Sequence, residues 1–238
     1  MSEQTLGIVG SGNIGAAVAR LAVRAGVRVL ISNSRGPRSL TSFADELGGG
    51  TRPVSIEEAA RASELVVVAI PFLRFRDLPP AYFEGQTVIE TMNFDPRRDQ
   101  EVAHLLEAGS TPSELVQAHL ADAHIVKAFS NIFAAHLELL ARPAGAPDRS
   151  ALPVVSDNGE SKRQAMSLLS ALGWDSVDVG SLSDSNLFDL GTPAFCAPYM
   201  KDSSGSWWDR LDTDPGMPLP ASQLRLKLDS ARLPHDRD

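Results

Sequence analysis

The sequence predicts an α/β fold built on a doubly wound parallel sheet, with a small C-terminal α/β portion and an irregular tail. Three observations predict it. Strand-like and helix-like patterns alternate along most of the 238 residues, the opening strand leads directly into the glycine-rich turn Gly10-Ser11-Gly12-Asn13-Ile14-Gly15, and the apolar runs are strand-sized. Such alternation is typical of parallel strands joined by crossover helices.

The amino-terminal segment has the pattern of a complete βαβ unit. Residues 5–9 are a compact apolar strand, and residues 13–25 carry apolar side chains at helical spacing. Gly26 ends this helix, and residues 27–31 form a second buried strand. Because crossovers between parallel strands are right-handed, this unit predicts a Rossmann-type sheet.

The same alternation continues as far as about residue 180. Helices are expected at residues 40–47, 56–62, 112–119, 133–141 and 160–172. Strands are expected at residues 52–54, 65–70, 87–90, 124–128, 152–156 and 176–179.

A composition shift divides the chain. Residues 142–150 are rich in Pro, Ala and Gly and have the character of a linker. We therefore predict a Rossmann domain at residues 1–150 and a small C-terminal domain with its tail at residues 151–238. The tail contains many prolines and the pair Trp207-Trp208, and it shows little periodicity.

The composition excludes several classes of partner. A formal net charge of -8 argues against nucleic acid and against an anionic membrane surface, since both need a clustered basic face. The single cysteine, Cys196, fits a reducing compartment, and no signal sequence precedes the first strand, so we expect a cytoplasmic protein. No His, Cys and carboxylate residues have metal-ligand spacing, and we expect no metal.

The glycine-rich turn predicts a dinucleotide site. In this motif the first glycine permits a tight turn, the second lets the backbone approach the pyrophosphate, and the third allows helix and strand to pack closely. Gly10, Gly12 and Gly15 fit these roles. The amide groups of the following helix, from Asn13 and Ile14 onward, then face the phosphates.

The end of the second strand favours NADP over NAD. NAD-binding proteins usually have an acidic residue there, whereas no acidic residue occurs between Glu3 and Asp45. Arg35 can donate charge-assisted hydrogen bonds to a 2′-phosphate, with Ser34 as a neutral donor and Arg38 as a second cation or a solvated arginine. We interpret Arg20, Arg24 and Arg28 as solvated.

Several segments resemble the family of NADP-dependent oxidoreductases that use the deazaflavin coenzyme F420. These are the glycine-rich turn, Ile31-Ser32-Asn33-Ser34-Arg35, Val126-Lys127-Ala128-Phe129-Ser130-Asn131-Ile132 and Leu187-Phe188-Asp189-Leu190-Gly191-Thr192-Pro193. The resemblance covers most of the chain up to about Pro193. It does not extend to the tail with Trp207 and Trp208.

The resemblance implies roles for particular residues. Ser11, Ser34 and Arg35 would surround the 2′-phosphate, with Arg38 near a further basic position. Ile70-Pro71 and Asn93 would lie along the cofactor toward the nicotinamide, although Asn93 also suits a plain turn. Ser130 stands where archaeal members tend to have a histidine, and Ile132 would form a wall of the hydride site, next to Phe133.

The chemistry of the acceptor is less defined by the sequence. A carbonyl or alcohol substrate needs a proton donor or acceptor, whereas transfer between two stacked rings needs little from the protein. Lys127 and His124 are the residues that could donate a proton, and a structural ion pair is the plainer role for Lys127. No catalytic residue is assigned.

We therefore expect an NADP(H)-dependent oxidoreductase that transfers hydride to a flat redox acceptor, with F420 or a flavin as co-substrate. Two alternatives stay open, an NADPH-dependent imine or carbonyl reductase and a non-catalytic sensor that binds NADP(H). Small cofactor domains often complete their site by dimerisation, so we also expect a homodimer. Trp207 and Trp208 suit either a substrate pocket or an interface.

Overall fold

One eight-stranded sheet runs through the whole molecule in the order β3-β2-β1-β4-β5-β6-β7-β8. The computed structural model describes residues 4–106, 109–211 and 213–233. Its strands are β1 (Thr5–Val9), β2 (Arg28–Ser32), β3 (Arg52–Pro53), β4 (Leu65–Val68), β5 (Thr87–Glu90), β6 (His124–Lys127), β7 (Ala151–Val155) and β8 (Asp175–Gly180). The predicted Rossmann-type α/β fold is confirmed.

The first six strands are parallel and have the classic 3-2-1-4-5-6 order of a dinucleotide-binding sheet. Val9 pairs with Ser32 on one side and with Val68 on the other. The strand order therefore reverses at β1, between β2 and β4, and this switch point lies directly under the glycine-rich turn. Ligands of open α/β sheets bind at such a point, outside the carboxyl ends of the strands.

The sheet continues into the C-terminal part of the chain. β7 pairs antiparallel with β6 through Lys127 and Val155, and β8 then pairs parallel with β7. The C-terminal strands thus extend the sheet of the N-terminal part. The boundary predicted at residue 150 stays a prediction, and it falls immediately before β7.

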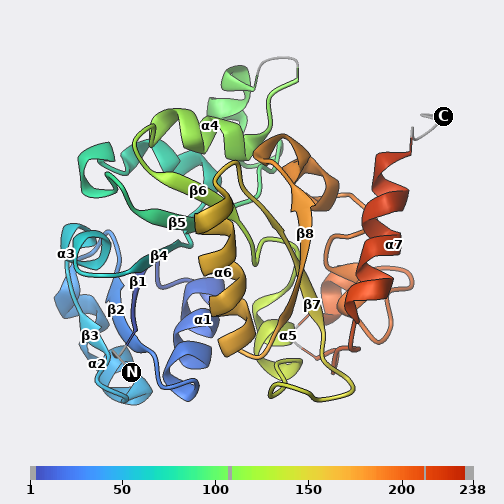
Figure 1. Cartoon of the computed structure of the whole chain (residues 1–238), viewed down its shortest axis with the longest axis horizontal. Helices are drawn as coiled ribbons and strands as arrows, with labels where there is room; N and C mark the ends of the chain where they lie inside the picture. Colours follow the sequence, from blue (N-terminus) through green and yellow to red (C-terminus); the bar gives the residue numbers. More distant parts are fainter. Residues whose placement is uncertain (1–3, 107–108, 212, 234–238) are drawn as a thin grey trace.

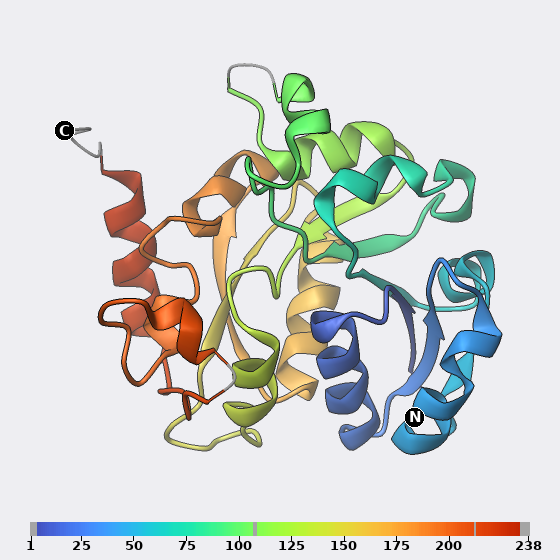
Figure 2. The same ribbon diagram turned by 180° about the vertical axis from the view of Figure 1, so that it is seen from behind.

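Helices cover both faces of the sheet. α6 (Gly159–Ala171) crosses the face turned toward the viewer in Figure 1, while α1 (Asn13–Arg24) and α5 (Ala134–Leu139) lie side by side on the face seen in Figure 2. The remaining α-helices are α2 (Thr41–Leu47), α3 (Ile56–Arg61), α4 (Pro112–His119) and α7 (Ala221–Arg232). None of the helices formed by the described residues has the length and apolar character that a membrane crossing needs.

The tail is not irregular throughout, as the sequence suggested. α7 begins after Pro220 and packs against β7 and β8 through the buried Leu224 and Leu228. Two buried leucines one helical turn apart are enough to pack this helix on the sheet, because its other side chains are exposed or only partly buried. In a tail rich in prolines, this short apolar pattern was not recognised as a helix. The described parts of the loops also contain short 3₁₀ segments, from η1 (Pro37–Leu40) to η7 (Trp207–Arg210), which periodicity does not detect.

A buried ion network joins the N-terminal strands to the C-terminal part. The side chain of Lys127 is fully buried, and its Nζ lies 3.3 Å from Glu90 Oε1 and 3.0 Å from Asp189 Oδ1. It also donates a hydrogen bond of 2.8 Å to the carbonyl of Met92. Burial opposes the charge, but Asp189 and Glu90 outweigh it and raise the pKa of Lys127. Lys127 is therefore a structural ion-pair residue.

Replacing Lys127 by methionine should strongly destabilise the fold. Glu90 would lose its cation in the interior, and breaking a buried pair from one side costs about 3–5 kcal/mol. The measurement is urea unfolding at pH 7, with the exposed Lys227→Met on α7 as the matched control. Because the pKa of Lys127 is raised, its contribution should persist through neutral pH and fade only above the ordinary lysine range. Equal midpoints for the two variants would contradict this role.

Candidate functional site

The glycine-rich turn has the close approaches that its motif requires. Gly10 has φ 108°, and a Cβ on it would lie 2.1 Å from the carbonyl oxygen of Ala69. A Cβ on Gly15 would lie 2.0 Å from the carbonyl oxygen of Gly10, because α1 packs against the turn. These two glycines therefore set how tightly β1, α1 and the segment after β4 meet.

The second glycine faces open space. A Cβ on Gly12 would meet no atom within 4 Å, so a side chain there would fill the volume in front of the helix. Gly12 is the N-cap residue of α1, no side chain caps this helix, and its first turn contains no acidic residue. Helix amides and the positive end of a helix dipole favour a phosphate group at such a position. The residues present fit the pyrophosphate of a dinucleotide.

A polar loop follows β2 beside the glycine-rich turn. Asn33 organises it, because its Nδ2 donates to Ser11 Oγ at 3.3 Å and its Oδ1 accepts from the backbone amide of Arg35 at 2.9 Å. Ser11, Ser34 and Arg35 line one cavity of about 320 Å³ together with the turn. Arg38 lies exposed on η1 and does not line that cavity.

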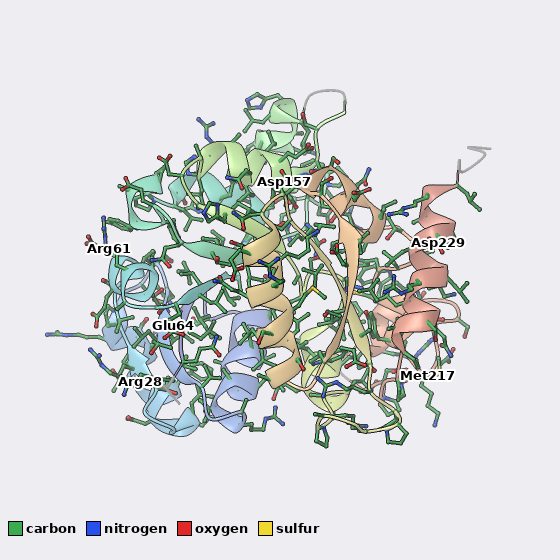
Figure 3. All side chains as sticks on the ribbon, viewed as in Figure 1. Arg28, Arg61, Glu64, Asp157, Met217 and Asp229 are labelled. Atoms are coloured by element: carbon green, nitrogen blue, oxygen red, sulfur yellow. The ribbon has the colours of Figure 1, made fainter. Side chains whose placement is uncertain are left out.

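The other arginines of the acid-free window lie elsewhere. Arg20 and Arg24 both form ion pairs with Glu138 of α5, at 3.1 and 2.9 Å. Arg28 is the first residue of β2 and so lies at the opposite end of that strand from the loop (Figure 3). Five arginines close in sequence thus separate into different environments, and Arg35 is the one at the cavity.

The groove continues past the turn toward the middle of the sheet. A second cavity is lined by Ile70 and Pro71 after β4 and by Asn93 after β5. It shares the turn residue Gly12 with the first cavity. Arg98 also lines it, paired with the buried Asp99 at 2.7 Å and donating to the carbonyl of Asn93 at 2.8 Å. An extended ligand can therefore lie along the carboxyl ends of β2, β1, β4 and β5.

A third cavity, of about 280 Å³, lies between the loop after β6 and the C-terminal segment. It shares residues with the second cavity, and its polar edge is formed by Asn93 and Ser130. Asn93 Nδ2 donates to the carbonyl of Ser130 at 2.7 Å, while Asn93 Oδ1 and Ser130 Oγ are buried and have no hydrogen-bond partner among the residues that the structure describes. These atoms offer an acceptor and a hydroxyl to an amide edge, such as a nicotinamide carboxamide.

The rest of this cavity is apolar. Its lining includes Ile132 and Phe133, together with residues that sequence reasoning did not assign to a site. Those additional residues are Phe129, Ala134, Ala135, Phe195, Cys196 and Leu211, with Thr91 at the polar edge. We refer to the third cavity as the acceptor pocket.

Two of the pocket residues have strained backbones. Phe129 has φ 61° and Cys196 has φ 47°, a region that non-glycine residues rarely occupy. Asn131 fastens the two loops together, since its carbonyl accepts from the Cys196 amide at 2.9 Å and its Nδ2 donates to the Ala194 carbonyl at 2.9 Å. Strain of this kind is retained where surrounding contacts over-determine a site.

The acceptor pocket contains no acid or base in its described lining. Of the residues that line it, only Cys196 can titrate, and burial raises the pKa of that thiol well above its usual value, so it is neutral. Lys127 is fully buried in its ion network, and His124 is exposed at the start of β6, the far end of that strand. Neither candidate proton donor lies at the pocket.

The described residues contain no cluster suited to a metal. Among residues 4–106, 109–211 and 213–233, no group of three His, Cys, Asp or Glu side chains could hold an ion.

The structure brings most of the predicted site residues into one groove. Of those predicted, Arg38 and Gly15 are not among the residues that line the three cavities, and Gly15 instead packs under the turn against the carbonyl of Gly10. Arg74 and Arg98 were missed although each follows a strand end that the prediction used. Phe195 and Leu211 were missed because they come from a distant part of the chain. The assigned roles stay predictions.

Comparisons with known families and structures agree with this geometry. Residues 5–94 match the family model described as NADP oxidoreductase, coenzyme F420-dependent. A comparison with curated proteins gave no match.

The solved structures add relatives of the whole fold. A hypothetical protein from Sinorhizobium meliloti is 30% identical, with a TM-score of 0.68, and the match covers 80% of this chain and 92% of that one. A "putative F420-dependent NADP reductase" from an Arthrobacter species is 19% identical, with a TM-score of 0.62 and coverages of 77% and 87%. A reductive aminase from Aspergillus terreus, solved with NADPH, is 14% identical, with a TM-score of 0.56 and coverages of 80% and 60%. The last two likenesses show the fold alone.

Replacing Arg35 by alanine should weaken the binding of NADPH far more than the binding of NADH. A charge-assisted hydrogen bond contributes about 1.5–3 kcal/mol, so the KM for NADPH should rise roughly tenfold to a hundredfold. The measurement compares KM for both cofactors in the variant and the wild type. Arg225→Ala, on the distant α7, is the matched control. Equal effects on NADPH and NADH would refute a role in reading the 2′-phosphate.

Proposed function

We propose that the protein passes hydride between NADPH and a flat redox acceptor. The premise is that the chain belongs to the NADP oxidoreductase family described as coenzyme F420-dependent and is an NADP-dependent oxidoreductase. The acceptor we favour is the deazaflavin F420 or a flavin. The observation that carries this proposal is the neutral acceptor pocket, which offers apolar walls and no acid or base among the described residues that line it.

The neutrality of the pocket separates two kinds of reaction. Reduction of a carbonyl or imine is usually assisted by a side chain that gives a proton to the substrate. Reduction of a deazaflavin or flavin forms a new bond to hydrogen on the acceptor ring, and the charge spreads over that ring until a proton arrives from solvent. The second reaction needs only close and parallel rings, with the reacting atoms about 3–3.5 Å apart.

The residues of the groove would divide the binding of the cofactor among them. Ser34 and Arg35 would hold the 2′-phosphate, Gly12 and the start of α1 the pyrophosphate, and Asn93 with Ser130 the carboxamide. When bound, NADPH supplies the hydride. Ile14, which lines both the second cavity and the acceptor pocket, would support the nicotinamide ring from below. The apolar walls would exclude water from the reacting face.

The test is NADPH oxidation with a panel of acceptors. We expect absorbance of the nicotinamide band to fall with F420 or with a flavin such as FMN, and not with cyclic imines or ketones. With NADPH carrying deuterium at C4, the label should appear at C5 of the reduced deazaflavin, because a carbon–hydrogen bond retains it. Turnover of imines without turnover of either ring acceptor would overturn the proposal in favour of an imine reductase. Tight NADP binding with no turnover of any acceptor would instead indicate a sensor.

A further inference from the structure

Four aromatic rings gather at the acceptor pocket. Trp207 and Trp208 stack with centroids 4.0 Å apart at 22°, and Phe133 meets them edge-on at 5.9 and 5.8 Å. Phe195 lies 6.2 Å from Trp208. We call Phe133, Phe195, Trp207 and Trp208 the aromatic cluster.

The cluster is continuous with the lining of the pocket. Phe133 and Phe195 line the pocket themselves, and Leu211, which follows the tryptophans by a few residues, lines it too. Trp208 packs against both phenylalanines yet keeps 45% of its surface exposed. An apolar ring that is packed on one side and open on the other can stack on a ligand at low entropic cost.

The segment that carries the tryptophans is held in place by polar contacts. Asp214 accepts from the backbone amides of Lys201 and Asp202 at 3.0 and 3.2 Å. Arg210 donates to the carbonyls of Asp202 and Ser204 at 3.2 and 2.7 Å. These contacts hold described residues on both sides of the tryptophan pair together.

The pocket and the cluster together define the shape of the acceptor. Asn93 lines both the second cavity and the acceptor pocket, and Ser130, whose carbonyl accepts from Asn93 Nδ2, lies beside it in the pocket. The side of the pocket formed by Phe133, Phe195 and Leu211 offers apolar and aromatic surface. A small carbonyl compound would use little of this surface. A three-ring heterocycle would enter beside the nicotinamide and still reach the cluster.

We infer that the aromatic cluster, with Trp208 as its open ring, is the platform that holds the ring system of a deazaflavin or flavin, and that the tail segment 195–211 thereby determines acceptor specificity. This inference rests on the proposed function and adds a part of the chain to it. Trp207 supports Trp208 from behind, as a positioning residue, since the two indoles are stacked.

The test measures ring binding separately from turnover. In protein saturated with NADP, quenching of tryptophan fluorescence and polarisation of riboflavin report the affinity for the isolated ring system. Trp208→Leu should weaken riboflavin binding about tenfold, the equivalent of one stacked ring, and should raise KM for F420 or FMN with little change in KM for NADPH. Trp208→Phe should recover most of the affinity. Leu226→Ala, an exposed apolar residue on α7, is the control and should change neither value.

The outcomes separate this inference from the proposed function. If the wild type reduces ring acceptors but Trp208→Leu binds riboflavin and F420 as well as the wild type does, the inference that the cluster holds the acceptor is refuted. The proposed function is then unaffected. If Trp208→Leu changes the oligomeric state in sedimentation and leaves ring affinity unchanged, the cluster is an interface and the inference is overturned. If no ring acceptor is reduced, the proposed function fails, while the riboflavin affinities still decide whether the cluster binds rings.

Discussion

The buried Lys127 network is the constraint on which the site depends. A lysine removed from water is tolerated only because Glu90 and Asp189 lie within 3.3 and 3.0 Å of its ammonium group. Glu90 also accepts from the Met92 amide at 2.8 Å, and Lys127 donates to the Met92 carbonyl. The backbone amide and the carbonyl of Met92, which follows β5, are thereby both held by the network. Asn93, the next residue, comes to the groove from this immobilised segment.

The charged groups of this network do not line the acceptor pocket. The carboxylates of Glu90 and Asp189 pair with Lys127 inside the fold, whereas the charge of the groove differs between its two ends. One end carries Arg35 and the amides at the start of α1, and the acceptor pocket has uncharged walls. Under the proposed function, the phosphates of the cofactor would bind at the first end, and hydride transfer would depend on how the two rings are positioned. Lys127, for which the sequence favoured a structural ion pair over proton donation, thus acts on the site through the backbone.

How much could be predicted from the sequence differs between the two ends of the groove. The glycine-rich turn and Arg35 lie in one βαβ unit, so local spacing was enough to place them. Phe195, Cys196 and Leu211 reach the acceptor pocket only because Asn131 fastens the loop after β6 to a segment more than sixty residues later in the chain. Contacts of that separation leave no periodic signal. Helix α7 was missed for a related reason, since two buried leucines among exposed residues form too short a pattern.

Ser130 shows how the pocket differs from a site built for proton transfer. A histidine at this position could hold or release a proton near neutral pH. Ser130 instead places a buried hydroxyl there, 4% exposed, next to Asn93 and without a hydrogen-bond partner among the described residues. A hydroxyl can donate or accept a hydrogen bond but does not titrate near neutral pH. The pocket can therefore bind a polar group without carrying a charge itself. Because Phe129, the preceding residue, and Cys196, which is hydrogen-bonded to Asn131, both have strained backbones, the chain maintains an energetically costly geometry around an uncharged polar group.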